Sequence, residues 1–120
     1  MINISLSTVS KKLGQHQQLE EIIAKVKQGF KQVYQEQLIN LVLFGSQARK
    51  DANSESDIDI LVVLKEKVND DEKHQNIIAL ISDLCIEYGV LVSCVYVDES
   101  QFKQEESPLL LNIRQEGILL

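Results

Sequence analysis

Two aspartates at the start of an apolar run are the residues in this chain best placed to do chemistry. Asp57 and Asp59 flank the first residue of the run that extends from Ile58 to Leu64. On a strand, residues two apart point to the same face, so we expect the two carboxylates to project together. Burying an unpaired charge is costly, so the pair calls for a counter-charge. Carboxylate oxygens suit Mg²⁺, which proteins often hold through one or two carboxylates and substrate phosphates.

A glycine–serine pair ends the preceding apolar run and could bind phosphate. Gly45 allows a sharp turn and the close approach of a ligand. Ser46 can cap a short helical turn expected over residues 46–50, whose free N–H groups form an anion site. Arg49 lies one helical turn further on and can add a fork-shaped positive charge. These residues indicate a phosphate site at a strand end next to the aspartates.

Each of these features is weak by itself. A Gly-Ser pair after a strand is common, and short motifs carry false positives. An Asp-x-Asp pair can also open a strand in solvent or cap neighbouring N–H groups. Arg49 alone would be read as a surface charge. The ordered combination of strand, Gly-Ser, turn with arginine, polar loop, Asp-x-Asp and strand is more specific than its parts.

Helices predicted by apolar spacing must support this site. Apolar residues three and four apart predict one amphipathic helix within residues 13–37 and a second over residues 70–88. Gly89 stands at the position where helices usually stop. Residues 98–106 read as a short helix or turn. Ser107 followed by proline predicts the start of a last helix, over residues 109–116.

Three apolar, β-rich segments predict strands over residues 38–44, 58–64 and 90–97. Residues 1–12 receive no assignment, and either a flexible lead-in or a docking turn fits them. The apolar tail at residues 118–120 must pack either on its own sheet or on a partner. The order of elements predicts one α/β (α+β) domain over residues 1–120, with two long helices packed on one face of a small mixed sheet.

The motif also carries a family resemblance. The run Phe-Gly-Ser-Gln-Ala-Arg from Phe44, followed by Ser-Asp-Ile-Asp-Ile-Leu-Val-Val from Ser56, resembles the signature of the polymerase-β-like nucleotidyltransferase superfamily. It is similar to the minimal, MNT-type prokaryotic branch. The resemblance implies the polymerase-β-like nucleotidyltransferase fold and binding of ATP and Mg²⁺. Many such domains are encoded beside a helical HEPN-type protein as antitoxin and toxin, and some transfer AMP onto a tyrosine of that partner.

By this resemblance, Gly45 and Ser46 grip the triphosphate with help from Arg49, and Asp57 and Asp59 are catalytic and bind the metals. One departure matters. The superfamily usually supplies a third carboxylate from a later strand, and the matching position here is Ser93. A serine hydroxyl is a poor metal ligand and no general base at neutral pH. Lys50 is a second departure, because many relatives have glycine there. Asp98 and Glu99 are nearby acids, although their spacing does not favour substitution for the missing one.

Three functions therefore remain open. The first is Mg²⁺-dependent transfer of AMP from ATP to a hydroxyl of a partner protein, within a HEPN/MNT-type toxin–antitoxin pair. The second is a catalytically weak or inactive nucleotide-binding module that neutralises a helical HEPN partner by complex formation. The third is a structural homo-oligomer without a ligand.

Composition limits the alternatives. The net charge of −6 opposes direct binding to DNA or other nucleic acid, which needs lysine and arginine to replace counterions. A nucleotide held through a divalent cation remains compatible with that charge. No apolar stretch reaches the length of a membrane span, and no secretory signal is evident. Cys85 and Cys94 lack metal-type spacing and read as reduced thiols, so we expect a cytoplasmic protein.

Overall fold

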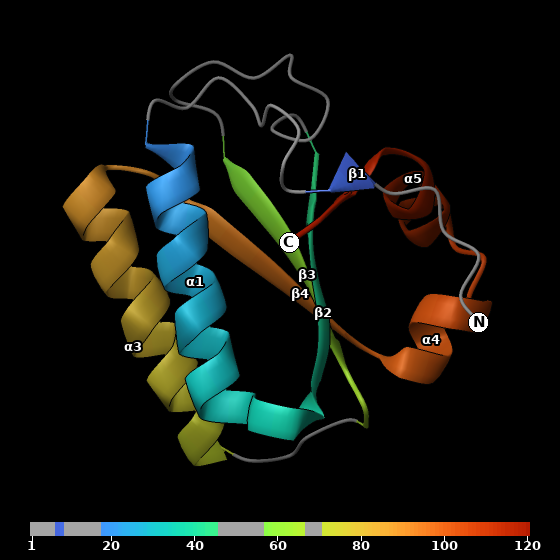
Figure 1. Cartoon of the computed structure of the whole chain (residues 1–120), viewed down its shortest axis with the longest axis horizontal. Helices are drawn as coiled ribbons and strands as arrows, with labels where there is room; N and C mark the ends of the chain where they lie inside the picture. Colours follow the sequence, from blue (N-terminus) through green and yellow to red (C-terminus); the bar gives the residue numbers. More distant parts are fainter. Residues whose placement is uncertain (1–6, 9–17, 46–56, 67–70) are drawn as a thin grey trace.

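A mixed five-stranded sheet forms the centre of the molecule, with strand order β1-β5-β2-β3-β4 (Figure 1). The computed structural model describes residues 7–8, 18–45, 57–66 and 71–120, so the turn expected over residues 46–50 lies outside the described part. The strands are β1 (Ser7–Thr8), β2 (Leu38–Phe44), β3 (Ile58–Leu64), β4 (Val92–Asp98) and β5 (Ile118–Leu119). β3 pairs antiparallel with β2 and parallel with β4.

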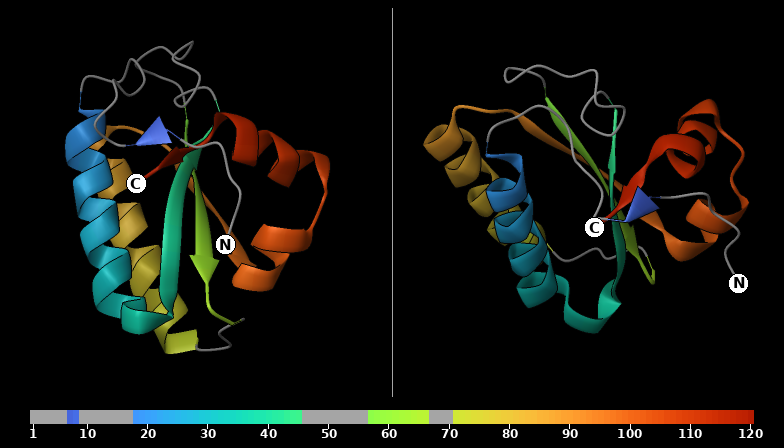
Figure 2. Two further views of the ribbon diagram at one scale, coloured as in Figure 1. Left: turned by 45° about the vertical axis from the view of Figure 1, so that its right-hand side comes forward. Right: turned by 45° about the horizontal axis from the view of Figure 1, so that its top comes forward.

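Two long helices lie side by side on one face of this sheet, and two shorter helices cover the other face (Figures 1 and 2). The long pair consists of α1 (Leu19–Tyr34), which continues into a 3₁₀ turn, η1 (Gln35–Gln37), and α3 (Asp71–Tyr88). The short pair consists of α4 (Glu99–Gln104) and α5 (Pro108–Glu116). The predicted α/β architecture, with two long helices on one face, is confirmed.

The alternation of side chains along β3 supplies both cores. Ile58, Ile60 and Val62 point toward α1 and α3 and belong to the larger apolar cluster. Leu61 and Val63 point to the opposite face. There they join a smaller cluster with residues of β2, α4 and α5, namely Val42, Phe102, Leu110 and Ile113. Because both faces of β3 are covered, its sequence is an almost unbroken apolar run.

The predicted boundaries hold best for the most apolar segments. The strands predicted over residues 38–44 and 58–64 begin and end as expected. The third strand begins and ends later than predicted, at Val92 and Asp98, because its pairing with β3 starts opposite Ile58 and ends opposite Leu64. The apolar tail packs on its own sheet, where Ile118 lies opposite Leu43 of β2. None of the helices in the described part of the chain is both long and apolar enough to cross a membrane.

Gly29 allows α1 and α3 to approach each other closely. It is a buried residue of α1, and a Cβ atom added to it would overlap Cδ2 of Leu80 on α3. Glycine costs a helix interior about 1 kcal/mol relative to alanine. The packing of Leu80 against the bare backbone is the structural reason for accepting that cost.

We therefore expect Gly29→Ala to destabilise the protein, although alanine is the better helix former. The half-buried side chain of Leu80 must move aside, and overpacking of this kind costs about 1–3 kcal/mol against a gain in helix propensity of about 1 kcal/mol. Urea unfolding of the wild type, Gly29→Ala, Leu80→Ala and the double variant measures the coupling between the two positions. In the Leu80→Ala background the cost of alanine at position 29 should disappear. A stabilising effect of Gly29→Ala in the wild-type background would contradict this account.

Candidate functional site

The end of β2 and the start of β3 bring Gly45 against Asp59. The β2–β3 register places Phe44 opposite Asp59, so Gly45 is the first residue beyond the pair. Gly45 has a φ of 75°, in the left-handed region that favours glycine. A Cβ atom at this position would lie 2.5 Å from Oδ2 of Asp59. Glycine is therefore required here for its backbone conformation and also for the space that the carboxylate occupies.

The two aspartates lie on the face of the sheet opposite the long helices. Asp59 shares its side of β3 with Leu61 and Val63, which are fully buried beneath α4 and α5. Asp59 itself is half-buried and Asp57 is exposed. The short helices therefore bury this face of β3 at Leu61 but not completely at Asp59. The carboxylates of Asp59 and Asp57 reach solvent.

The electrostatics of the pair favour a cation. Burial raises the pKa of Asp59 above its ordinary value, and the negative charge of Asp57 raises that pKa further. Neither cause is a positive side chain of the part of the chain that the structure describes. Two hard oxygen donors whose negative charges repel each other fit an ion such as Mg²⁺, which completes its coordination with phosphate oxygens and water. The residues present therefore fit the divalent metal that the sequence predicts.

Ser93 lies beside Asp59, at the position where the resemblance predicts a third carboxylate in other members of the superfamily. The parallel register of β3 and β4 places Ser93 directly opposite Asp59. Ser93 also shares its face of β4 with Val95 and Val97, which pack against the smaller apolar cluster. Within the described ranges, no group of three histidine, cysteine or acidic side chains is placed to hold a metal ion.

Asp98 does not replace the missing acid. It lies opposite Leu64, at the far end of the β3–β4 pairing, five positions along the strand from Ser93. At the usual rise of a strand this is a separation of roughly 16 Å. The carboxylate of Asp98 caps α4, where Oδ1 accepts a hydrogen bond of 2.7 Å from the N–H of Gln101. Asp98 therefore has a structural role.

The structure thus brings together Gly45, Asp57, Asp59 and Ser93 from three strands that are neighbours in the sheet. Ser46 and Arg49, the other two residues predicted to contact the phosphates, lie outside the described residues, as does Lys50. Sequence reasoning gave Gly45 a role toward a ligand but missed its contact with Asp59. No sequence signal reports that contact, because it depends on the register between two strands.

Gly45→Ala should destabilise the protein more than the same change at another left-handed glycine. Gly89 has a φ of 65°, and a Cβ atom added there would meet nothing within 4 Å. Gly89→Ala therefore carries only the backbone cost, about 1–2 kcal/mol, whereas Gly45→Ala must also displace the Asp59 carboxylate. Urea unfolding of both variants measures the difference. Equal losses would show that the space at Gly45 has no importance for stability.

The raised pKa of Asp59 predicts a dependence of stability on pH. A carboxyl that binds its proton more tightly in the folded chain favours folding at low pH, and the protein loses this stability as the pH rises through the folded-state pKa. Asp59→Asn cannot ionise at this position. The free energy of unfolding of the variant, relative to wild type, should therefore increase as the pH rises from below the ordinary value of 3.8 toward neutrality.

The measurement is urea unfolding in EDTA at a series of pH values. Asp83→Asn, at an exposed position on α3, serves as the matched control. A difference between Asp59→Asn and wild type that stays constant or shrinks with rising pH would contradict the predicted environment of Asp59.

Comparison with known proteins agrees with this geometry. A family model described as a nucleotidyltransferase domain matches residues 20–116. Two proteins of Methanocaldococcus jannaschii, each named "Putative protein adenylyltransferase", are similar in sequence. One is 38% identical over 73 residues, which are 61% of this chain and 73% of that protein. The other is 31% identical over 102 residues, which are 84% of this chain and 96% of that protein.

Solved structures show the same fold at lower identity. A chain from a crystal structure of a toxin–antitoxin pair with AMP-PNP aligns with a TM-score of 0.57 and 20% identity, covering 80% of this chain and 69% of that one. A chain from the structure of a tri-AMPylated Shewanella oneidensis HEPN toxin in complex with MNT antitoxin aligns with a TM-score of 0.52 and 19% identity. The alignment covers 83% of this chain and 69% of that one. The family predicted from the Gly-Ser and Asp-x-Asp motif is thereby confirmed: this chain is a nucleotidyltransferase and belongs to the nucleotidyltransferase domain family.

Proposed function

We propose that this chain binds ATP with Mg²⁺ at the junction of β2 and β3 and transfers AMP to a hydroxyl group of a partner protein. The observation that carries the proposal is the contact between the bare backbone of Gly45 and the carboxylate of Asp59. It sets a turn without a side chain beside two carboxylates whose charges repel each other, in a domain of the nucleotidyltransferase family. That combination suits a polyphosphate and the cation that accompanies it.

The proposed roles follow from the position of each residue. Gly45 lets the phosphates approach the backbone closely, and Ser46 and Arg49 supply a hydroxyl and a guanidinium for the phosphate oxygens. Asp57 and Asp59 hold the metal. When bound, Mg²⁺ would supply charge stabilisation for an in-line displacement at the α-phosphorus, in which the hydroxyl oxygen of the partner forms the new P–O bond and pyrophosphate leaves.

Because Ser93 is not a carboxylate, we expect AMP transfer to be slow. Superfamily members usually carry a carboxylate here, beside the first two, and that acid helps to deprotonate the attacking hydroxyl. Ser93 lies at the right place, opposite Asp59, but its hydroxyl does not accept a proton at neutral pH. Removal of the acceptor's proton then falls to solvent.

The partner that we propose is a small helical protein of the HEPN type, and the pair would act in the cytoplasm as toxin and antitoxin. Support comes from solved structures of the same fold, one of which contains an MNT antitoxin in complex with a tri-AMPylated HEPN toxin. The names of the two archaeal relatives support a protein as the acceptor. Ser93 favours the second function, in which a weak or inactive site serves for nucleotide binding and the chain neutralises its partner by complex formation.

Incubation with ATP labelled at the α-phosphate, Mg²⁺ and a helical protein of the HEPN type tests the reaction. We expect label on a hydroxyl side chain of that protein, with loss of labelling in EDTA and in Asp59→Asn. Ser93→Asp should restore the third carboxylate and raise the labelling rate about tenfold or more, because a positioned base typically contributes at least that much.

Isothermal titration calorimetry with Mg²⁺-ATP distinguishes the alternatives. Binding of Mg²⁺-ATP without transfer, together with inhibition of the partner by wild type and by Asp59→Asn alike, would establish neutralisation by complex formation. Absence of Mg²⁺-ATP binding by the wild-type protein would overturn both forms of the proposal.

A further inference from the structure

The edge of β2 that faces away from β3 is only partly paired. β5 covers Val42 and Leu43 on this side, and the N–H of Leu120 donates a hydrogen bond of 2.9 Å to the carbonyl of Leu41. Over residues 38–40, no strand in the described part of the chain pairs with β2 on this side. Unpaired backbone groups at such an edge are a template for another extended chain.

A groove lies directly beside this open edge. It has a volume of about 410 Å³ and lies between α1 and residues 38–41 of β2, with Leu120 at the end that β5 occupies. Its apolar lining comes from Leu38, Ile39 and Leu41. A second hollow of about 530 Å³ continues along α1 as far as Glu20. The groove is therefore in line with β5 and has an apolar wall, which suits an added strand.

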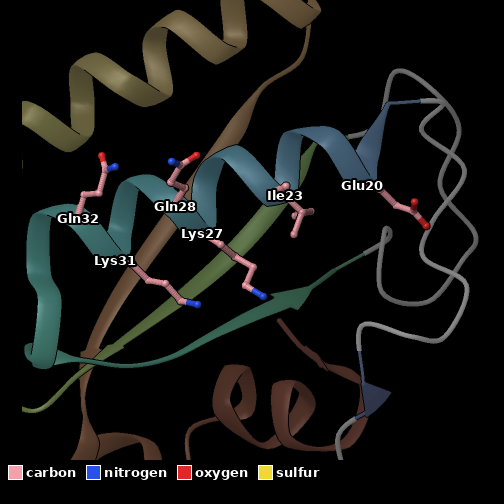
Figure 3. A pocket seen from close by; sticks show the side chains of 7 residues that line it. Glu20, Ile23, Lys27, Gln28, Lys31 and Gln32 are labelled. Carbon is pink, nitrogen blue, oxygen red and sulfur yellow. The ribbon is translucent and has the colours of Figure 1, made fainter.

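Two lysines of α1 line both hollows. Figure 3 shows the side chains of Lys27 and Lys31 extending from the helix on the side where β2 runs. Neither forms an ion pair with a described residue, whereas Lys25 pairs with Glu87 at 3.3 Å and Lys103 with Glu99 at 3.8 Å. In a chain of net charge −6, this pair is a local positive patch beside a groove with both apolar and polar lining residues.

The spacing of the lysines matches that of a strand. Lys27 and Lys31 are four residues apart, which is about 6 Å along a helix axis. Residues two apart on a strand point to the same side and lie about 6.8 Å from each other. An extended segment with acidic residues at alternating positions could therefore present one carboxylate to each lysine.

We propose that this edge binds an extended segment of a partner protein, in which acidic and apolar residues alternate, as an additional strand beside β2. Backbone hydrogen bonds to residues 38–40 and carboxylate contacts to Lys27 and Lys31 hold the segment. The open strand edge and the apolar lining favour a polypeptide over nucleic acid, which the net charge also disfavours. The inference does not depend on the proposed nucleotide chemistry, because the groove and the aspartates are separate sets of residues.

A capped, fluorescent peptide in which glutamate and valine alternate is the probe, and fluorescence anisotropy measures its binding to the full chain. We expect saturable binding and slower hydrogen exchange at the amides of residues 38–40. Lys27→Gln/Lys31→Gln should weaken binding about fivefold to tenfold, the effect of losing two partly exposed ion pairs. Lys103→Glu changes the net charge by the same two units at an exposed position on α4 and should leave binding unchanged.

Further experiments distinguish addition of the peptide as a strand from a general attraction between opposite charges. A peptide with N-methyl groups on alternate amides should lose binding, because it cannot complete the backbone ladder. Equal binding of that peptide, or equal weakening by Lys103→Glu, would overturn the proposal. So would competition for the site by single-stranded RNA, or a dimer in analytical ultracentrifugation that Lys27→Gln/Lys31→Gln dissolves.

Discussion

The antiparallel pairing of β2 with β3 is the constraint on which the rest of the site depends. This register sets Phe44 opposite Asp59 and so brings the backbone of Gly45 into the space beside the carboxylate. A slip of one residue would turn every side chain of β3 to the opposite face. The apolar residues of β3 would then exchange cores, and Asp59 would point into the core beneath the long helices. The packing of two hydrophobic cores therefore fixes the orientation of the acidic pair.

The two faces of the sheet are covered by different helices and to different extents. The face under α1 and α3 is closed by a tight helix pair, in which Gly29 accommodates Leu80. The face under α4 and α5 is covered only from Leu61 onward, so the start of β3 remains open to solvent. Two carboxylates that reach solvent and a strand that is otherwise buried thus lie together within residues 57–64. The limited length of the short helices is what makes this possible.

Stability and function oppose each other at this site. Asp57 and partial burial both disfavour the charged form of Asp59, so the charge that suits the site for a cation is a cost to the folded protein. A third carboxylate opposite Asp59 would add to that repulsion, and Ser93 avoids it. Ser93 therefore adds no charge beside Asp59, and in the proposed reaction it also supplies no base. The edge of β2 over residues 38–40, which no described strand pairs on the side away from β3, lies beside Lys27 and Lys31.

The sequence by itself determined the strands at residues 38–44 and 58–64, the long helices and the family. Those features depend on local patterns: unbroken apolar runs, apolar residues three and four apart, and a Gly-Ser and Asp-x-Asp motif at a specific separation. Only the tertiary structure decided the contact of Gly45 with Asp59, the pairing of the C-terminal residues with β2, and the later start of β4. The open edge beside Lys27 and Lys31 belongs to the same group. These features depend on pairing between residues far apart in the chain, and register between strands is set by the packing of all the layers together, which no local pattern encodes.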